Sequence, residues 1–134
     1  MGCLEVIVLD TCAIIWDALD SSKLSSNAKN AIELNARELI ISDISIWEIS
    51  MLIKRKRLVV DDTASGFINL LLQSRNYLVQ EITPEIAELS VNFGEEINND
   101  PADRLIAATS VLANAPVVTV DKNLRTAALL ETIW

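Results

Sequence analysis

Apolar segments with little internal alternation recur along the chain, and amphipathic segments separate them. The apolar segments are short and rich in β-branched residues, which is typical of strands buried on both faces of a parallel sheet. We therefore predict four strands and a short fifth one at the C-terminal end. They cover residues 4–9, 38–42, 77–81, 115–121 and 131–134.

The segments between these strands carry helical signals. Apolar side chains recur at near-helical spacing in residues 25–36, and a second such segment starts near Ser45. Thr83–Pro84 and Asp100–Pro101 each place a capping residue before a proline, which is a preferred start of a helix. Further helices are predicted over residues 13–19, 63–74 and 123–130.

This alternation of strands and helices predicts an α/β fold. We expect a central, mostly parallel sheet of four to five strands with helices on both faces. No linker or repeat divides the 134 residues, so a single domain over residues 1–134 is predicted. Folds of this kind bind ligands at the carboxyl ends of the strands, near the point where the strand order reverses. The strand ends are therefore where functional residues are expected.

Composition and charge narrow the chemistry. The chain has no histidine, which excludes a Ser-His-Asp triad, a histidine general base and a histidine-ligated zinc ion. Hydrolysis would have to rest on carboxylates, on lysines or on a metal with oxygen ligands. The net charge of −8 by itself argues against nucleic-acid binding, but residues 54–57, "KRKR", gather four of the eleven bases in one place.

Nothing in the sequence indicates secretion or a membrane span. The first residues lack the basic and apolar regions of a signal peptide, and the longest uncharged stretch, residues 105–120, is too short for a confident span. Cys3 and Cys12 show no zinc or redox spacing, so we expect two reduced thiols. These features predict a cytoplasmic protein with no membrane contact.

Four carboxylates fall near the predicted strand ends. Asp10, Glu48 and Asp121 lie directly after a strand or one turn beyond it. Asp103 lies in the first turn of the helix that leads into the fourth strand. Each also has a purely structural explanation. Asp10 and Asp121 could cap helices, while Glu48 could form an S-x-x-E capping box with Ser45. Asp103 could complement a helix dipole.

Taken together, the four carboxylates favour a functional interpretation, because the sheet would gather them around one cleft. Two charges about 5 Å apart repel by roughly 3 kcal/mol at an effective dielectric constant of about 20, so six pairs approach ~20 kcal/mol. A domain is stable by only about 5–15 kcal/mol, so such a cluster needs protons or divalent cations. Oxygen ligands alone favour Mg²⁺ or Mn²⁺, and metal pairs held by carboxylates commonly cleave phosphodiesters.

Four motifs also occur in order across the chain: "VIVLDTCAII", "ISDISIWEIS", "NNDPADRLIAATS" and "VVTVDKNLR". Together with the closing "ETIW" they resemble a PIN domain, specifically the VapC-type toxins of toxin–antitoxin pairs. The resemblance implies the PIN-domain fold and an endoribonuclease that depends on Mg²⁺ or Mn²⁺ and leaves a 5′-phosphate and a 3′-hydroxyl. It also implies an RNA substrate, a cognate antitoxin and a homodimer, with the apolar helices 44–53 and 63–72 as candidate interfaces.

The resemblance assigns metal binding and catalysis to the acidic quartet, by which we mean Asp10, Glu48, Asp103 and Asp121. The first three members would hold the principal metal, and the last would complete a second or substrate-dependent site. Ala102 stands where many relatives carry an aromatic residue, a departure that concerns local packing. The positions that match supporting residues of the family are Thr11, Ser45, Thr119 and Asp100. For Asp100, a helix-capping role is an equal alternative.

Basic and aromatic residues give weaker indications. The basic run at residues 54–57 follows the second motif on the same predicted helix, so it could grip RNA phosphates or simply be a solvated helix end. Arg104 and Arg125 adjoin the motifs and could bind RNA or an antitoxin segment. Trp16 and Trp47 are interpreted as core or interface aromatics rather than as base-stacking platforms. The candidate RNA-binding residues are Lys54, Arg55, Lys56, Arg57 and Arg104.

Other classes of protein are alternatives to a nuclease. A haloacid-dehalogenase-like phosphatase needs a second acid two residues after Asp10, and Cys12 stands there instead. The stronger alternative is a non-catalytic PIN-like module that binds RNA or protein without cutting. A short open reading frame immediately upstream of the gene would favour the toxin.

Overall fold

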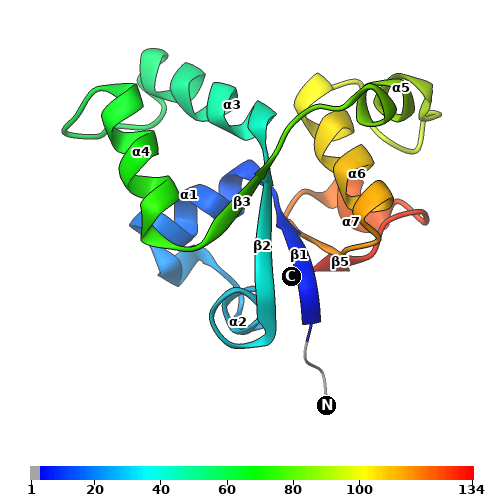
Figure 1. The fold of residues 1–134 in the computed structure, drawn as a ribbon, viewed down its shortest axis with the longest axis horizontal. Coiled ribbons are helices and arrows are strands. Elements are labelled where there is room, and N and C mark those ends of the chain that lie inside the picture. The colour runs from blue at the N-terminus through cyan, green and yellow to red at the C-terminus, as the bar shows by residue number, and fades with distance from the viewer. Residues whose placement is uncertain (1–3) are drawn as a thin grey trace.

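The computed structural model describes residues 4–134, in which strands and helices alternate as predicted (Figure 1). Cys3 lies outside these residues. The strands are β1 (Leu4–Leu9), β2 (Ala36–Ser42), β3 (Tyr77–Gln80), β4 (Val117–Val118) and β5 (Thr132–Ile133). The α-helices are α1 (Thr11–Leu19), α2 (Ser26–Asn30), α3 (Asp43–Lys54), α4 (Ala64–Ser74), α5 (Pro84–Asn92), α6 (Pro101–Ala113) and α7 (Lys122–Thr126). Within residues 4–134 none of the helices has the length and apolar character needed to cross a membrane.

The five strands form one sheet in the order β3-β2-β1-β4-β5, and every neighbouring pair is parallel. This confirms the predicted fold class and makes the sheet parallel throughout. The chain first adds β2 and β3 on one side of β1 and then returns to add β4 and β5 on the other. The strand order therefore reverses between β1 and β4, where the carboxyl ends of strands leave a crevice for ligands.

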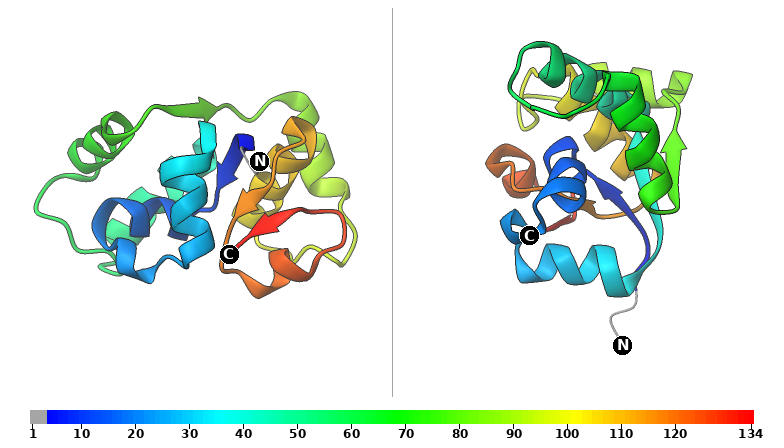
Figure 2. Two further views of the ribbon diagram at one scale, coloured as in Figure 1. Left: turned by 90° about the horizontal axis from the view of Figure 1, so that it is seen from below. Right: turned by 90° about the vertical axis from the view of Figure 1, so that its left-hand side faces the viewer.

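Helices cover both faces of the sheet, as predicted. Successive residues of β1 point to opposite faces: Ile7 and Leu9 join a core cluster with side chains of α1 to α4, whereas Val8 joins Ile106 of α6. Figures 1 and 2 show α1 to α4 on one side of the strands and α5 to α7 on the other. With both faces covered, β1 is buried and its carboxyl end is held at the centre of the molecule.

Two predicted helix starts are confirmed. Thr83 caps α5 through its hydroxyl, which accepts from the backbone N–H of Ile86 at 3.2 Å, and Pro84 is the first helical residue. Asp100 caps α6 in the same way ahead of Pro101. Because a cap and a proline act within one turn, these starts depend on local sequence alone.

Other predicted bounds were wrong. The helix predicted from Ser45 begins at Asp43 instead, since the Ser42 hydroxyl accepts from the N–H of Ile44 and caps α3. The single helix predicted over residues 25–36 is divided into α2 and a π-helical turn, η2 (Ala31–Asn35), and a 3₁₀ turn, η1 (Ser21–Lys23), precedes it. The predicted helix 123–130 ends at Thr126, because Ala127 and Leu130 turn back into a buried cluster around Leu124.

A partly buried ion pair joins the last turn of α1 to the residue that follows α4. The Asp17 side chain is 3% exposed, and Arg75 donates to both of its oxygens, from Nε at 2.6 Å and from a terminal nitrogen at 2.9 Å. The Tyr77 hydroxyl donates to the same carboxylate at 3.1 Å. Burial first, and then the negative charge of Asp17, raises the pKa of Tyr77. The helix whose first residue is Thr11 is therefore anchored at its last turn by charge-assisted bonds.

Candidate active site

Asp10 lies where β1 ends and is 7% exposed. Its Oδ1 accepts from the backbone N–H of Thr11 at 2.7 Å, and its Oδ2 accepts from the buried hydroxyl of Thr119 at 2.6 Å. The backbone N–H of Asp10 donates to the carbonyl of Val118 at 3.0 Å. Asp10 therefore both caps α1 and joins the ends of β1 and β4 at the point of strand-order reversal.

The Thr119 hydroxyl also contacts the next member of the quartet. It accepts from the backbone N–H of Asp121 at 3.0 Å while it donates to Asp10. The Asp121 carboxylate caps α7, accepting from the N–H of Leu124 at 3.1 Å. One buried hydroxyl thus links two acids of the quartet. Asp10 and Thr119, which it joins, are 109 positions apart in the sequence.

Glu48 reaches the same region from α3. Its Oε1 accepts a short hydrogen bond from the Thr11 hydroxyl, and the Ser45 hydroxyl lies 2.8 Å from that same Thr11 oxygen. Because α3 starts at Asp43, Ser45 lies inside the helix and the capping box suggested for Ser45 and Glu48 does not form. Glu48 is therefore in the second turn, where it serves no cap and its carboxylate is held toward the end of β1.

Asp103 completes the quartet from the first turn of α6. The Asp100 carboxylate caps this helix, accepting from the N–H groups of Ala102 at 2.8 Å and Asp103 at 3.4 Å. The capping alternative for Asp100 is thus observed. The Asp103 side chain is partly buried, and its Oδ2 accepts from the amide of Asn98 at 2.9 Å. The two acids of the D-P-x-D motif therefore have separate contacts.

The acids share one electrostatic environment. Burial is the main cause that raises the pKa of Asp10 and of Glu48 above their ordinary values. Burial also raises the pKa of Asp103 to about 7, although the hydrogen bond from its amide partner opposes the rise. Other carboxylates add to each shift: Asp121 and Asp100 act on Asp10, and Asp10 acts on both Glu48 and Asp103. The side chains are therefore near enough to disfavour each other's charge.

The pKa of Cys12 also indicates that the four carboxylates of the acidic quartet lie close together. Cys12 is exposed on α1 and forms no disulfide. Partial burial of the thiol is the largest cause that raises the pKa of Cys12 to about 11. The negative charges of all four members of the acidic quartet raise it further. The thiol therefore stays protonated near neutral pH and is a poor nucleophile.

The donor set suits a hard divalent cation. All four groups are carboxylates, three of them with raised pKa values, so a cation would relieve both their burial and their repulsion. Within residues 4–134, however, no three Asp, Glu, His or Cys side chains form a group already arranged to hold a metal ion. Each carboxylate of the quartet accepts from a protein donor instead.

The sequence matches the PIN domain family over residues 7–130. The chain belongs to the PIN domain family. Ribonuclease VapC22 of Mycobacterium tuberculosis is 30% identical to it over 122 residues, which cover 91% of this chain and 92% of that protein. The resemblance drawn from the four sequence motifs is therefore confirmed.

Solved structures share this PIN-domain fold. A toxin–antitoxin complex from Klebsiella pneumoniae contains a chain with a TM-score of 0.65 and 22% identity, covering 92% of this chain and 94% of that one. DNA-bound VapBC from Salmonella typhimurium gives a TM-score of 0.70 at 15% identity, covering 96% and 97% of the two chains. VapBC2 from Rickettsia felis, bound to a promoter DNA fragment, gives 0.68 at 16% identity, covering 95% and 96%.

The candidate RNA-binding residues differ in whether their side chains are available to bind RNA. Arg104 donates from Nε and both terminal nitrogens to five backbone carbonyls between Ser90 and Asn98, at 2.7–3.1 Å. Because a guanidinium has five N–H donors, all of them are used in these bonds and none is left for RNA. Residues 54–57 are all exposed at the end of α3.

The aromatic candidates also differ from each other. The Trp16 ring lies 5.8 Å from that of Trp134, centroid to centroid, at the edge of the main core cluster. Trp47 is 57% exposed, so the core role considered for it is wrong. It stands beside Glu48 in sequence but points out of the molecule, and an interface role remains for it.

The basic residues at the end of α3 form a compact turn. The N–H of Arg57 donates to the carbonyl of Leu52 at 2.9 Å, and that of Lys56 donates to Ile53 at 3.1 Å, which is the Schellman pattern. Lys56 has a φ of 60°, a left-handed conformation that favours glycine. A lysine is thus held where glycine would be more stable.

Two functional candidates were missed at the level of sequence. Asn98 donates to Asp103, and its backbone and side-chain N–H groups both donate to the side-chain oxygen Oδ1 of Asn123, at 2.9 and 3.2 Å. The only signal was their place inside the motifs "NNDPADRLIAATS" and "VVTVDKNLR". Nothing in either motif indicates that the two residues meet.

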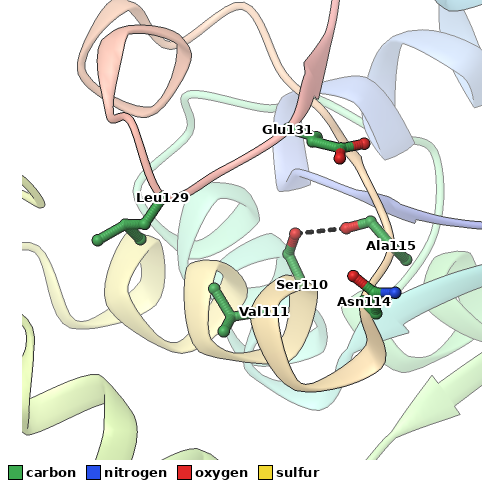
Figure 3. A pocket seen from close by; sticks show the side chains of 6 residues that line it. All are labelled: Ser110, Val111, Asn114, Ala115, Leu129 and Glu131. Atoms are coloured by element: carbon green, nitrogen blue, oxygen red, sulfur yellow. Dashed lines mark hydrogen bonds between the residues drawn. The ribbon is translucent and has the colours of Figure 1, made fainter.

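A small cavity lies beside the last turn of α6, whereas Asp103 of the acidic quartet lies in the first turn of that helix. Figure 3 shows the residues that line the cavity. Its volume is about 140 Å³. The Ser110 hydroxyl beside it donates to the Ala115 carbonyl at 2.5 Å, so it is already satisfied. The cavity adds no chemistry to the site. Its lining residues are Ser110, Val111, Asn114, Ala115, Leu129 and Glu131.

The raised pKa of Asp103 predicts a pH-dependent stability in metal-free buffer. Between about pH 4 and pH 7 the folded protein keeps a proton that the unfolded chain has released, so this group's stabilisation is lost as pH rises through 7. Above that pH, Asp103→Asn should therefore be more stable than the wild type, by about 1–2 kcal/mol after allowance for solvent screening. Urea denaturation at several pH values measures this.

The exposed carboxylate of Asp61 provides the control. Asp61→Asn should leave the pH dependence of the wild type unchanged. If Asp103→Asn is as stable as the wild type above pH 7, then the charged Asp103 carboxylate does not destabilise the folded protein as its raised pKa implies.

Proposed function

We propose that this PIN domain is a divalent-metal-dependent endoribonuclease and the toxin of a toxin–antitoxin pair. The observation that carries the proposal is the cluster of carboxylates with raised pKa values, Asp10, Glu48 and Asp103, at the carboxyl end of the sheet. VapC22 is named a ribonuclease, and solved structures with this fold are toxin–antitoxin complexes. RNA is thus the proposed substrate, an antitoxin the proposed partner and the cytoplasm the proposed location.

The acidic quartet would hold Mg²⁺ or Mn²⁺. Its first three members would bind the principal ion, and Asp121 would complete a second or substrate-dependent site. When bound, a divalent cation activates water and stabilises charge on the phosphate oxygens. The protein's contribution is to orient the ligands. Thr119 fixes one oxygen of Asp10, and Thr11 holds Glu48 at the start of α1. Since these carboxylates now accept from protein donors, binding would rearrange some of those bonds.

We expect purified, antitoxin-free protein to cleave total RNA at discrete sites with Mg²⁺ or Mn²⁺ and not with EDTA. Asp103→Asn removes a proposed ligand and should lower the rate by about 100-fold or more, while Asp61→Asn should be fully active. Sequencing the 5′-phosphate ends would identify the target. Folded protein that cuts nothing with either metal would favour the non-catalytic module. Cleavage that survives Asp103→Asn would contradict the metal site.

The basic turn of residues 54–57 would bind RNA phosphates. All four residues are exposed, and they lie at the end of the helix that carries Glu48. Arg55 follows Glu48 by seven residues, hence about two turns along a similar face. Lys56 keeps a charge in a left-handed conformation that costs a lysine about 1 kcal/mol. A charge retained against such a cost suits a role in binding.

Lys56→Gly should therefore stabilise the protein and weaken RNA binding together. Glycine tolerates the positive φ, so the free energy of unfolding should rise by about 1 kcal/mol. One lost phosphate contact should also lower the slope of log affinity against log salt by about 0.7. Urea denaturation and RNA titrations of the inactive Asp10→Asn background at several salt concentrations measure the two effects.

Lys54→Gly is the matched control, since it removes the same charge from inside α3. It should weaken RNA binding similarly but destabilise the protein by about 1 kcal/mol, because glycine is a poor helix former. A salt slope unchanged in both variants would show that the turn does not contact RNA.

The outer faces of α3 and α4 would form a homodimer interface. Trp47 on α3 is 57% exposed and Leu70 on α4 is 65% exposed. A groove of about 460 Å³ between the two helices includes Ile46, Ile68 and Leu72 among its lining residues. Exposed apolar side chains beside an apolar groove are typical of protein interfaces.

Trp47→Glu should convert a wild-type dimer to a monomer, because it places a charge at the centre of the proposed interface. Sedimentation velocity measures the mass. Val91 on α5 is 74% exposed outside this face, so Val91→Glu should leave the dimer intact. A monomeric wild type, or a dimer broken only by Val91→Glu, would contradict the proposed interface.

A further inference from the structure

Asn98 stands between Asp103 and the start of α7. It belongs to the loop that joins α5 to α6, and its side-chain nitrogen donates to Asp103 Oδ2 at 2.9 Å and to Asn123 Oδ1 at 3.2 Å. Asn123 lies in the first turn of α7, directly after the strand-end region of Asp121. The loop, the first turn of α6 and the start of α7, which lies 25 residues further along the chain, therefore meet at one amide.

The hydrogen bonds of Asn98 leave its side chain no freedom to turn. Its backbone N–H donates to Asn123 Oδ1 at 2.9 Å, and its Oδ1 accepts from the N–H of Asp100 at 2.8 Å. Its backbone carbonyl accepts from Arg104 Nε at 2.7 Å. Rotating the amide would break the bonds to Asp100, Asp103 and Asn123 together, so its nitrogen is fixed toward Asp103.

This contact suits a metal-binding carboxylate. An amide nitrogen can only donate, so it orients Asp103 Oδ2 without competing for a cation. Within residues 4–134 the other oxygen, Oδ1, has no hydrogen bond from the protein. Asp103 is thus held through one oxygen and keeps the other available, the arrangement by which outer partners usually orient metal ligands.

Loop stability alone does not explain the asparagine. In addition to the carbonyl of Asn98, Arg104 already binds three further carbonyls of the loop and that of Ser90 in the last turn of α5. Those bonds involve no atom of the Asn98 side chain, so the loop backbone keeps this support when the amide is removed. Two bonds disappear with the amide and have no replacement, the one from the Asp100 N–H and the one to Asp103, and only the second reaches a carboxylate of the acidic quartet.

We propose that Asn98 is a positioning residue that orients Asp103 for metal binding, and that Asn123 holds Asn98 in place. This inference rests on the proposed function and extends it to residues outside the acidic quartet. Asn98 acts through Asp103 and touches neither the metal nor the RNA in this scheme.

The test is the affinity of Asn98→Ala for Mn²⁺, measured by titration calorimetry without RNA. We expect affinity to fall by about 10-fold to 100-fold, the usual loss for an outer partner of a ligand. In the RNA assay kcat should fall at limiting Mn²⁺ and recover in excess Mn²⁺, while KM for RNA stays unchanged. Asn99→Ala is the matched control, because that neighbouring asparagine is exposed, and it should bind Mn²⁺ as the wild type does.

The role of Asn123 is tested by a double-mutant cycle. Asn123→Ala should weaken Mn²⁺ binding less than Asn98→Ala, and the double variant should bind no more weakly than Asn98→Ala alone, because both act on one contact. Mn²⁺ affinity that is equal in Asn98→Ala and Asn99→Ala overturns the proposal, and fully additive losses overturn the link through Asn123.

Asp103→Asn separates this inference from the proposed function. If Asp103→Asn loses Mn²⁺ while Asn98→Ala keeps it, the metal site stands and the positioning role is wrong. If the wild type itself binds no Mn²⁺, both are overturned. Thermal unfolding of each variant confirms that the compared proteins are folded, and a defect that excess Mn²⁺ does not restore would count as structural and against positioning.

Discussion

Repulsion between carboxylates at one end of the sheet is the constraint around which the rest of the molecule is arranged. The strand order brings these carboxylates together. Strand β1 is central and pairs with β4, so Asp10 and Asp121, which follow these two strands, lie at the same edge of the sheet. Burial and shared negative charge raise the pKa of Asp10, Glu48 and Asp103. A cluster of this kind opposes folding unless protons or cations offset it.

Buried hydroxyls are what hold the acids in place. Thr119 and Ser45 are completely buried and Thr11 nearly so, and each bonds across elements rather than within its own. Hydroxyls buried in this way need partners, so the bonds that satisfy them also set the direction of Asp10 and Glu48. Packing of the fold and orientation of the site therefore depend on the same few contacts.

The acidic and basic residues are concentrated in different parts of the molecule, which the net charge alone does not show. The net charge of −8 suits a site that a cation would neutralise, whereas the exposed bases are concentrated in the turn after α3. Arg104 shows that a base next to an acid of the quartet need not be free for a partner, since all its donors bind backbone carbonyls. Position in the sequence could not distinguish it from the bases of the turn.

The sequence by itself determined the fold class, the order of elements and the family, because strand burial, caps and prolines act over a few residues. It located β1 without error and the starts of α5 and α6, where Thr83 and Asp100 cap before proline. It also singled out the acids at the strand ends as candidates, since strand and helix patterns reveal where strands stop.

Only the tertiary structure decided which partners each side chain has. In the structure Glu48 accepts a hydrogen bond from Thr11 and forms no capping box, and Trp47 is exposed. Asn98 donates to both Asp103 and Asn123. The contacts of Glu48 with Thr11 and of Asn98 with Asn123 join residues 37 and 25 positions apart, and local propensity carries no information about them. They follow from how strands and helices pack, which no stretch of sequence specifies alone.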